Sequence, residues 1–196
     1  MNNLQMFGKT TTDSNLKSKT QFMSNQNQIC NSCGSTKSKL ACESCQTSVC
    51  KNCIQFIDDE RFVLNPEITK TILHSAYCPN CFEKEVAPIE EKYKQIATAA
   101  ESILVYDKIQ GKETRLLKRL EKPVFAKQCT DRKIALLRLA YFAAEAGFNG
   151  IIDVEIKSDK IRNGSYQTTI WSGSGIPTHI EPKKIIKDRS LTKNPN

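Results

Sequence analysis

The chain has 196 residues, a formal net charge of +8, nine cysteines and a hydrophobic fraction of 39%. That fraction is low for one large core, so we expect two small domains with polar connections. No segment approaches the roughly 20 consecutive apolar residues of a membrane helix, which excludes a membrane span. The first residues lack the basic-then-apolar order of a secretory signal, so we expect a cytoplasmic protein whose thiols stay reduced.

The first 28 residues are mostly Asn, Gln, Ser and Thr. Such a segment cannot bury enough apolar surface to offset the entropy of ordering, and we predict that residues 1–28 are disordered. The cysteine region, residues 29–86, follows. Its apolar side chains are too few for an independent core, so we expect this region to be stabilised by cross-links.

Eight of the nine cysteines form four Cys-x2-Cys pairs, namely Cys30/Cys33, Cys42/Cys45, Cys50/Cys53 and Cys78/Cys81. A reducing compartment disfavours disulfides, a redox dithiol would explain one pair but not four, and iron–sulfur cysteines do not usually come as evenly built pairs. Zinc bound by four thiolates fits best, and eight thiolates predict two structural Zn²⁺ ions per chain. The spacing leaves open whether the pairs share the ions sequentially or crosswise.

The stretch "CESCQTSVCKNC", followed by "YCPNCFEKE", resembles the FYVE-type zinc fingers over about residues 30–85. In that family four Cys-x2-Cys pairs hold two ions in a cross-brace, with four residues between the middle pairs. The resemblance implies a crosswise division of the ligands. One site would use Cys30, Cys33, Cys50 and Cys53, and the other Cys42, Cys45, Cys78 and Cys81.

The departures from the family bear on function. Lipid-reading members carry a basic double-histidine motif, where this chain has "KSKLACES" with Lys37 and Lys39 but no histidine. An upstream Trp-x-x-Asp is also missing, so we expect no phosphoinositide binding. A ubiquitin-ligase RING would need a Cys-x-His pair, which is absent. His74 lies near the fourth pair and would be a ligand only if a cysteine were not used.

The sequence pattern of the second half is typical of an α+β domain. Apolar positions three to four residues apart predict a linker helix from about Pro88 to Glu101, within residues 87–101. Strands are predicted at 102–107 and 122–129. A helix follows Asp131 and stops at Gly147, and it is apolar round most of its circumference except for Arg138 and Glu145. A hairpin from residue 152 turns at Asn163-Gly164, and the basic tail at 181–196 is predicted to be flexible.

The block "RKIALLRLAYFAAEAGFNGIIDVEIKSDK" resembles the YbjQ-like family of small bacterial domains, which carry a heavy-metal-binding label. The resemblance, over about residues 102–180, implies a dodecin-like fold in which a helix lies on a small antiparallel sheet. That family assembles into rings, and we expect a homo-oligomer, with a pentamer favoured. Cys129 and His179 are the only soft ligands there, and we interpret Cys129 as a small buried residue and His179 as a surface residue.

Residues 87–196 carry about +7 of the net charge. Within them, Arg115, Lys118, Arg119 and Lys122 form a basic cluster at helical spacing, a candidate nucleic-acid contact. No nucleophile, base and orienting group form a recognisable catalytic motif, so we expect no enzyme. The sequence thus predicts a zinc-binding scaffold that displays zinc modules on an oligomeric ring to an unknown protein partner. The alternative is a nucleic-acid-binding or metal-responsive protein that uses the basic C-terminal half.

Overall fold

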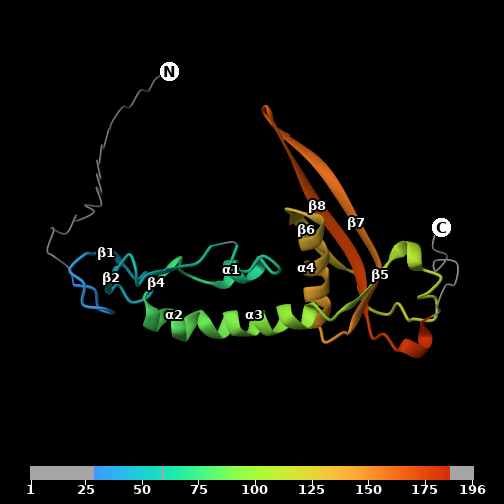
Figure 1. Ribbon diagram of the computed structural model, residues 1–196, viewed down its shortest axis with the longest axis horizontal. Coiled ribbons are helices and arrows are strands. Elements are labelled where there is room, and N and C mark those ends of the chain that lie inside the picture. Colours follow the sequence, from blue (N-terminus) through green and yellow to red (C-terminus); the bar gives the residue numbers. More distant parts are fainter. Residues whose placement is uncertain (1–28, 59, 186–196) are drawn as a thin grey trace, which may run out of the picture.

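The computed structural model describes residues 29–58 and 60–185. The segment predicted to be disordered, residues 1–28, lies outside this part of the chain, as does most of the predicted flexible tail. The molecule is elongated, with the cysteine region at one end and a sheet domain at the other, as Figure 1 shows. No helix within the described residues is long and apolar enough to span a membrane.

The cysteine region consists of short elements joined by turns. Strands β1 (Ser38–Ala41) and β2 (Ser48–Cys50) pair antiparallel, and so do β3 (Gln55–Phe56) and β4 (Ala76–Tyr77). Helix α1 (Glu67–Thr71) lies between β3 and β4 in the chain and contributes no buried residue. Helix α2 (Pro79–Glu85) carries the last cysteine pair at its start. Because so little regular structure supports this region, its stability depends on the cross-links that the cysteine side chains could form.

Helix α3 (Ala87–Ala100) continues almost in line with α2 and runs the length of the molecule's middle (Figure 1). The sequence predicted this helix between Pro88 and Glu101, one residue later at each end. It is more than a spacer, because Tyr93 and Ala100 are buried on one face. The Tyr93 hydroxyl also accepts a hydrogen bond from the Leu64 N–H at 3.2 Å. The linker therefore packs against both halves of the chain.

The sheet has four strands in the order β5-β7-β8-β6. Their bounds are β5 Leu104–Asp107, β6 Val124–Cys129, β7 Gly150–Asn163 and β8 Tyr166–Thr178. The predicted antiparallel sheet is wrong for one edge, since β5 runs parallel to β7. A parallel pair needs a long crossover, and here β6 and α4 supply it between the two strands. The 3-10 helices are Lys108–Gln110 and Pro182–Lys184.

Helix α4 (Arg132–Glu145) begins at the predicted cap, where the Asp131 carboxylate accepts from the Ile134 N–H at 2.8 Å. It ends before Gly147, whose φ of 80° lies in the left-handed region that glycine adopts at low cost. Leu139 and Ala143 are fully buried in the cluster that joins α4 to the sheet. The sheet therefore covers one face of this helix.

The other apolar face of α4 is covered by the same chain rather than by a second subunit. Tyr141 packs on Tyr93, with ring centroids 5.4 Å apart, and Tyr93 packs edge-on against Phe62 at 5.2 Å. Phe62 belongs to the cysteine region, and all three rings share one buried cluster. The layers are thus α3 with the segment around residues 61–72, then α4, then the sheet.

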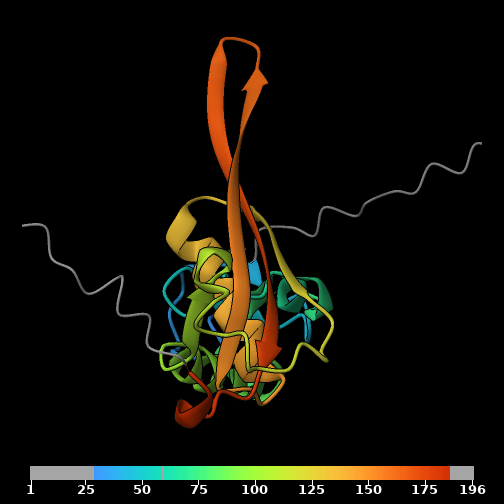
Figure 2. The same ribbon diagram turned by 90° about the vertical axis from the view of Figure 1, so that its right-hand side faces the viewer.

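The β7–β8 hairpin is much longer than the sheet it belongs to. Its two-residue turn is Gly164-Ser165, one position later than predicted, with φ of 62° at Gly164. The outer part of the ribbon projects from the body as an arm, as Figure 2 shows. Beyond Val154 on β7 and Trp171 on β8, no third strand pairs with either edge in the described part of the chain. The term arm is used below for residues 158–170.

We expect Phe62→Ala to lower the free energy of unfolding by about 3–5 kcal/mol, because Phe62 is fully buried and truncation leaves a cavity under Tyr93. Urea unfolding at a fixed excess of zinc measures this loss. The matched control is Phe56→Ala, whose ring is 54% exposed and which should cost less than about 1 kcal/mol. Equal losses from the two variants would contradict the packing described here.

Candidate metal centres

Each Cys-x2-Cys pair sits in a tight turn that aims two sulfur atoms the same way. In the first pair the Gly34 N–H donates to the Cys30 carbonyl at 2.8 Å, and in the second the Gln46 N–H donates to the Cys42 carbonyl at 2.8 Å. Gly34 and Gln46 both have positive φ, 73° and 62°. The second turn therefore carries backbone strain at a non-glycine residue, as functional turns often do.

The other two pairs use different frames. In the third pair the N–H groups of Cys53 and Ile54 donate to the Cys50 carbonyl at 3.0 and 3.1 Å. In the fourth, Cys78 caps α2, and its sulfur accepts from the Cys81 N–H at 3.4 Å. A thiolate held at a helix start is stabilised by the free N–H groups there.

The β1–β2 ladder and two backbone hydrogen bonds bring distant pairs together. The β1–β2 ladder sets Ser38 opposite Cys50, and the Asn31 N–H donates to the Ser48 carbonyl at 3.0 Å, which places the first pair beside the third. The Glu43 N–H donates to the Ala76 carbonyl at 2.9 Å, which places the second pair beside the fourth. Backbone pairing, rather than the spacing of the cysteines, therefore decides which pairs meet.

The eight sulfurs form two groups of four, and within each group every sulfur lies within 4.8 Å of the others. The first tetrad is Cys30, Cys33, Cys50 and Cys53, and the second is Cys42, Cys45, Cys78 and Cys81. This is the crosswise division that the FYVE-type resemblance implies. The sequential division does not occur, since the first and second pairs belong to different tetrads.

The sulfur spacing suits a tetrahedral ion. A metal–sulfur distance of about 2.3 Å puts the corners of a tetrahedron about 3.8 Å apart. The sulfurs of Cys33 and Cys50 are 3.6 Å apart, and those of Cys45 and Cys78 are 3.7 Å apart. All nine cysteines are free thiols, and these separations far exceed a disulfide bond. Each tetrad could therefore hold one metal ion.

In the first tetrad, the pKa of one thiol is lowered and that of another is raised. A backbone hydrogen bond from Cys50 lowers the pKa of Cys30 to about 6. The thiols of Cys33 and Cys50, and then burial, raise the pKa of Cys53 to about 12. Cys30 is thus the thiol that ionises more readily, while Cys53 resists ionisation. A divalent cation removes the repulsion and lets all four ionise.

The second tetrad shows the same division and two hydroxyl partners that the sequence reasoning missed. The Thr47 hydroxyl, 3.0 Å from the Cys45 sulfur, lowers the pKa of Cys45 to about 6. The Ser44 hydroxyl lowers the pKa of Cys81, but burial and the nearby thiols outweigh it and raise this pKa to about 12. Hydroxyl residues one position before or two positions after a metal ligand often donate hydrogen bonds to the ligand sulfur. That spacing is the sequence signal from which Ser44 and Thr47 could have been predicted.

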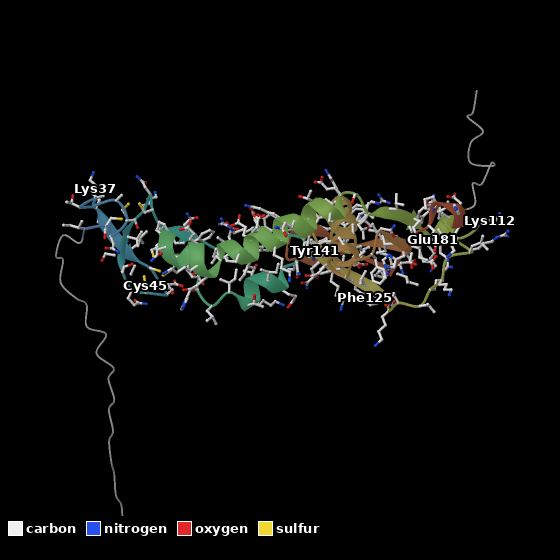
Figure 3. All side chains as sticks on the ribbon, turned by 90° about the horizontal axis from the view of Figure 1, so that it is seen from below. Lys37, Cys45, Lys112, Phe125, Tyr141 and Glu181 are labelled. Carbon is white, nitrogen blue, oxygen red and sulfur yellow. The ribbon has the colours of Figure 1, made fainter. Side chains whose placement is uncertain are left out.

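The chemistry of the donor set is that of a structural site. Four sulfurs complete a tetrahedron and leave no position for water or substrate. The cysteines also form most of the local core, with Val49, Tyr77 and Val86 as their buried apolar neighbours. When bound, an ion would supply the cross-link that these few side chains cannot. The tetrads lie at the outer end of the molecule, where Figure 3 labels Cys45.

The remaining soft ligands stand apart from the tetrads. His74 packs edge-on against Tyr77 at 5.8 Å, His179 is exposed against the ring of Phe148, and Cys129 is buried, which raises its pKa. In residues 29–58 and 60–185, none of them joins a group of metal-ligating side chains. Cys129 is buried and His179 is exposed, as the sequence analysis expected.

The basic cluster does not form a helical face. Residues 111–123 lie in turns and loop, with Arg115, Lys118 and Lys122 exposed. Arg119 forms an ion pair within the domain, because its Nε and Nη2 donate to the Asp153 carboxylate at 2.5 and 2.9 Å. Asp153 occupies a bulge of β7 with φ of 53°, and the ion pair holds it there. Of the predicted four, Arg115, Lys118 and Lys122 therefore form no ion pair with any residue that the structure describes.

We expect paired serine variants to report the crosswise division. Cys30→Ser with Cys50→Ser removes two ligands from one tetrad, so the purified protein should keep one zinc per chain. Cys30→Ser with Cys42→Ser damages both tetrads and should leave less than one. Metal analysis after gel filtration measures the content, with Cys129→Ser as the control that keeps two. The reverse ranking would mean that the pairs share ions sequentially.

No protein-family model, no curated protein and no solved structure matches this chain. The likeness to FYVE-type fingers and to YbjQ-like domains therefore stays a prediction from the residues quoted above. What the described residues do carry is two four-cysteine groups with the spacing of metal centres, in a chain of mixed α and β structure.

Proposed function

We propose that this chain is a zinc-binding, non-enzymatic scaffolding protein, with a FYVE-like module that holds two Zn²⁺ ions and does not read phosphoinositides. The observation that carries the proposal is the pair of sulfur tetrads with tetrahedral spacing. Closed four-sulfur sites serve folding rather than catalysis, and four thiolates favour Zn²⁺ over harder ions. Free thiols at all nine positions suit a reducing, cytoplasmic location.

The proposal extends to self-association through the arm. Directly opposed residues of an antiparallel pair point to the same face, so Ile161 shares one face of the arm with Thr168, Ile170 and Tyr166. Ile161 is 48% exposed and Tyr166 is 80% exposed. An isolated two-stranded ribbon is marginal in water, and its open edges favour pairing with another strand. A second copy of the chain would cover this face, in the YbjQ-like ring, with five subunits favoured.

The arm and the tetrads lie far apart, so assembly through the arm would leave the zinc modules free (Figure 1). Each module would then present its surface to a protein partner several times over. Multivalency raises the apparent affinity of a weak contact without any new interaction. This is the sense in which the chain acts as a scaffold.

The nucleic-acid alternative has less support. Arg119 is bound to Asp153, and the remaining cations stand on a loop without helical order. Metal sensing would need an exchangeable site. In both tetrads a buried cysteine is paired with an exposed one, so neither is distinguished as the more open site.

We expect native mass spectrometry of the full chain to give two zinc ions per subunit and an oligomer. Ile161→Asp with Tyr166→Asp should reduce the oligomer to monomers with the zinc content unchanged. The matched control is Leu73→Asp with Phe56→Asp, since both side chains are exposed but lie in the cysteine region, and assembly should persist. A monomeric wild-type protein would refute the self-association, and a chain without zinc would refute the metal function.

A further inference from the structure

Arg138 is a buried cation without a counter-ion. The side chain lies on α4 and the residue is only 8% exposed. Its Nη1 and Nη2 donate to the carbonyls of Lys127 and Val63, both at 2.6 Å. Within the described residues no carboxylate forms an ion pair with it, and its buried Nε has no partner. Two neutral carbonyls do not balance a buried charge, so the site still favours an anion.

Arg138 is one of the residues that line a cavity of about 480 Å³ between the segment that starts at Pro66 and the sheet domain. Small-molecule sites commonly measure about 300–1,000 Å³ and often lie where two parts of a protein meet. We call this cavity the junction pocket. It is separate from both sulfur tetrads, since no cysteine lines it.

The walls of the junction pocket carry an excess of positive charge. Lys70 and Glu67, both in the wall, neutralise each other through an ion pair of 2.6 Å. Lys127 is exposed and forms no ion pair with any described residue. Arg138 and Lys127 therefore leave two uncompensated positive charges in one cavity. A phosphate monoester carries nearly two negative charges at neutral pH.

The remaining wall suits a flat apolar group. Phe142 is half-buried there, and Phe125 is 55% exposed on an edge strand, on the outside of the sheet domain in Figure 3. Gln128 adds an amide and has φ of 53°, at a place where the β6 ladder shifts register between Ala126 and Cys129. Such strained residues on bulged strands concentrate at ligand sites, where the bulge re-aims a side chain.

We propose that the junction pocket binds a small organic anion, a phosphate or carboxylate attached to an aromatic body. The anionic group would lie against Arg138 and Lys127, and the ring would stack on Phe142 beside the edge strand that carries Phe125 at the rim. Guanidinium groups bind both oxyanions through paired hydrogen bonds, so the two chemistries share one anchor. The ligand would connect the cysteine region to the sheet domain, because the wall comes from both.

The test is calorimetric titration of the zinc-loaded full chain with four probes. Adenosine monophosphate and 2-naphthoate carry both features, whereas adenosine lacks the anion and inorganic phosphate lacks the ring. We expect saturable binding of one or both of the first two, and affinities at least about tenfold weaker for adenosine and phosphate. Binding of adenosine monophosphate alone identifies the phosphate form, and binding of naphthoate alone identifies the carboxylate form.

Two exposed positions locate the site without threatening the fold. Lys127→Gln and Phe125→Ala should each weaken binding at least about fivefold, while Lys133→Gln, an exposed lysine of α4 outside the pocket, should leave it unchanged. The Arg138 Nε–H resonance should shift with the anionic probes and stay in place with adenosine.

Absence of saturable binding by both anionic probes would overturn the proposal, as would affinities that neither pocket variant changes. The zinc content of the same samples keeps this outcome separate from the metal function. A chain that retains two zinc ions but binds no anion refutes the junction pocket alone.

Discussion

The constraint on which the cysteine region depends is the charge repulsion that would arise if all eight crowded thiols ionised without a cation. The sulfurs are close enough to share an ion, and in each tetrad one thiol is acidic while another resists ionisation. Among the described residues, the buried cluster around the cysteines contains only Val49, Tyr77 and Val86 besides the cysteines, because Phe62 and Leu64 pack with α3 and α4 instead. So few apolar side chains cannot by themselves offset the entropy of ordering residues 29–86, which costs about 1–2 kcal/mol per residue for the backbone. A cation in each tetrad would turn the repulsion into a cross-link, and the short strands around it would be held in register.

The two ends of the molecule are joined by packing rather than by a flexible tether. Helix α4 is apolar on two faces, and the chain covers both, one with the sheet and one with rings from the cysteine region and α3. Arg138 adds a polar connection, because its two hydrogen bonds reach the carbonyls of Val63 and Lys127 from a single side chain. A cation used in this way fixes the segment around Val63 on the sheet domain. The same guanidinium also leaves an unbalanced positive charge in the junction pocket. Arg138 therefore serves both the contact between the two parts of the chain and the candidate ligand site.

Charge in the second half is distributed differently from what the composition suggests. Part of the basic excess is consumed internally, where Arg119 fixes the strained Asp153 and Lys108 contacts Glu155 at 3.4 Å. The arm instead exposes Ile161 and Tyr166 on one face and directs Lys160 and Arg162 to the other, because side chains alternate along a strand. Open edges, and a face that exposes Ile161 and Tyr166 beside Asp159 and Thr168, favour association with another chain over a purely electrostatic contact. The arm is therefore the surface through which assembly is proposed.

The sequence by itself determined the local elements and the kind of chemistry. The positions of α3, α4 and the hairpin follow from apolar periodicity and from Asp131, Gly147 and Gly164, because caps and turns depend on residues that are neighbours in the chain. Four Cys-x2-Cys pairs predict soft-metal sites for the same reason. The tertiary structure decided what depends on distant partners. Spacing left two ways to divide the cysteines, and the β1–β2 ladder together with the Asn31–Ser48 and Glu43–Ala76 backbone hydrogen bonds selected the crosswise one. Four further features could not be predicted from the sequence, since each arises from residues that meet only when the chain folds. They are the parallel pairing of β5, the packing of rings on the second face of α4, the ion pair of Arg119 and the buried charge of Arg138.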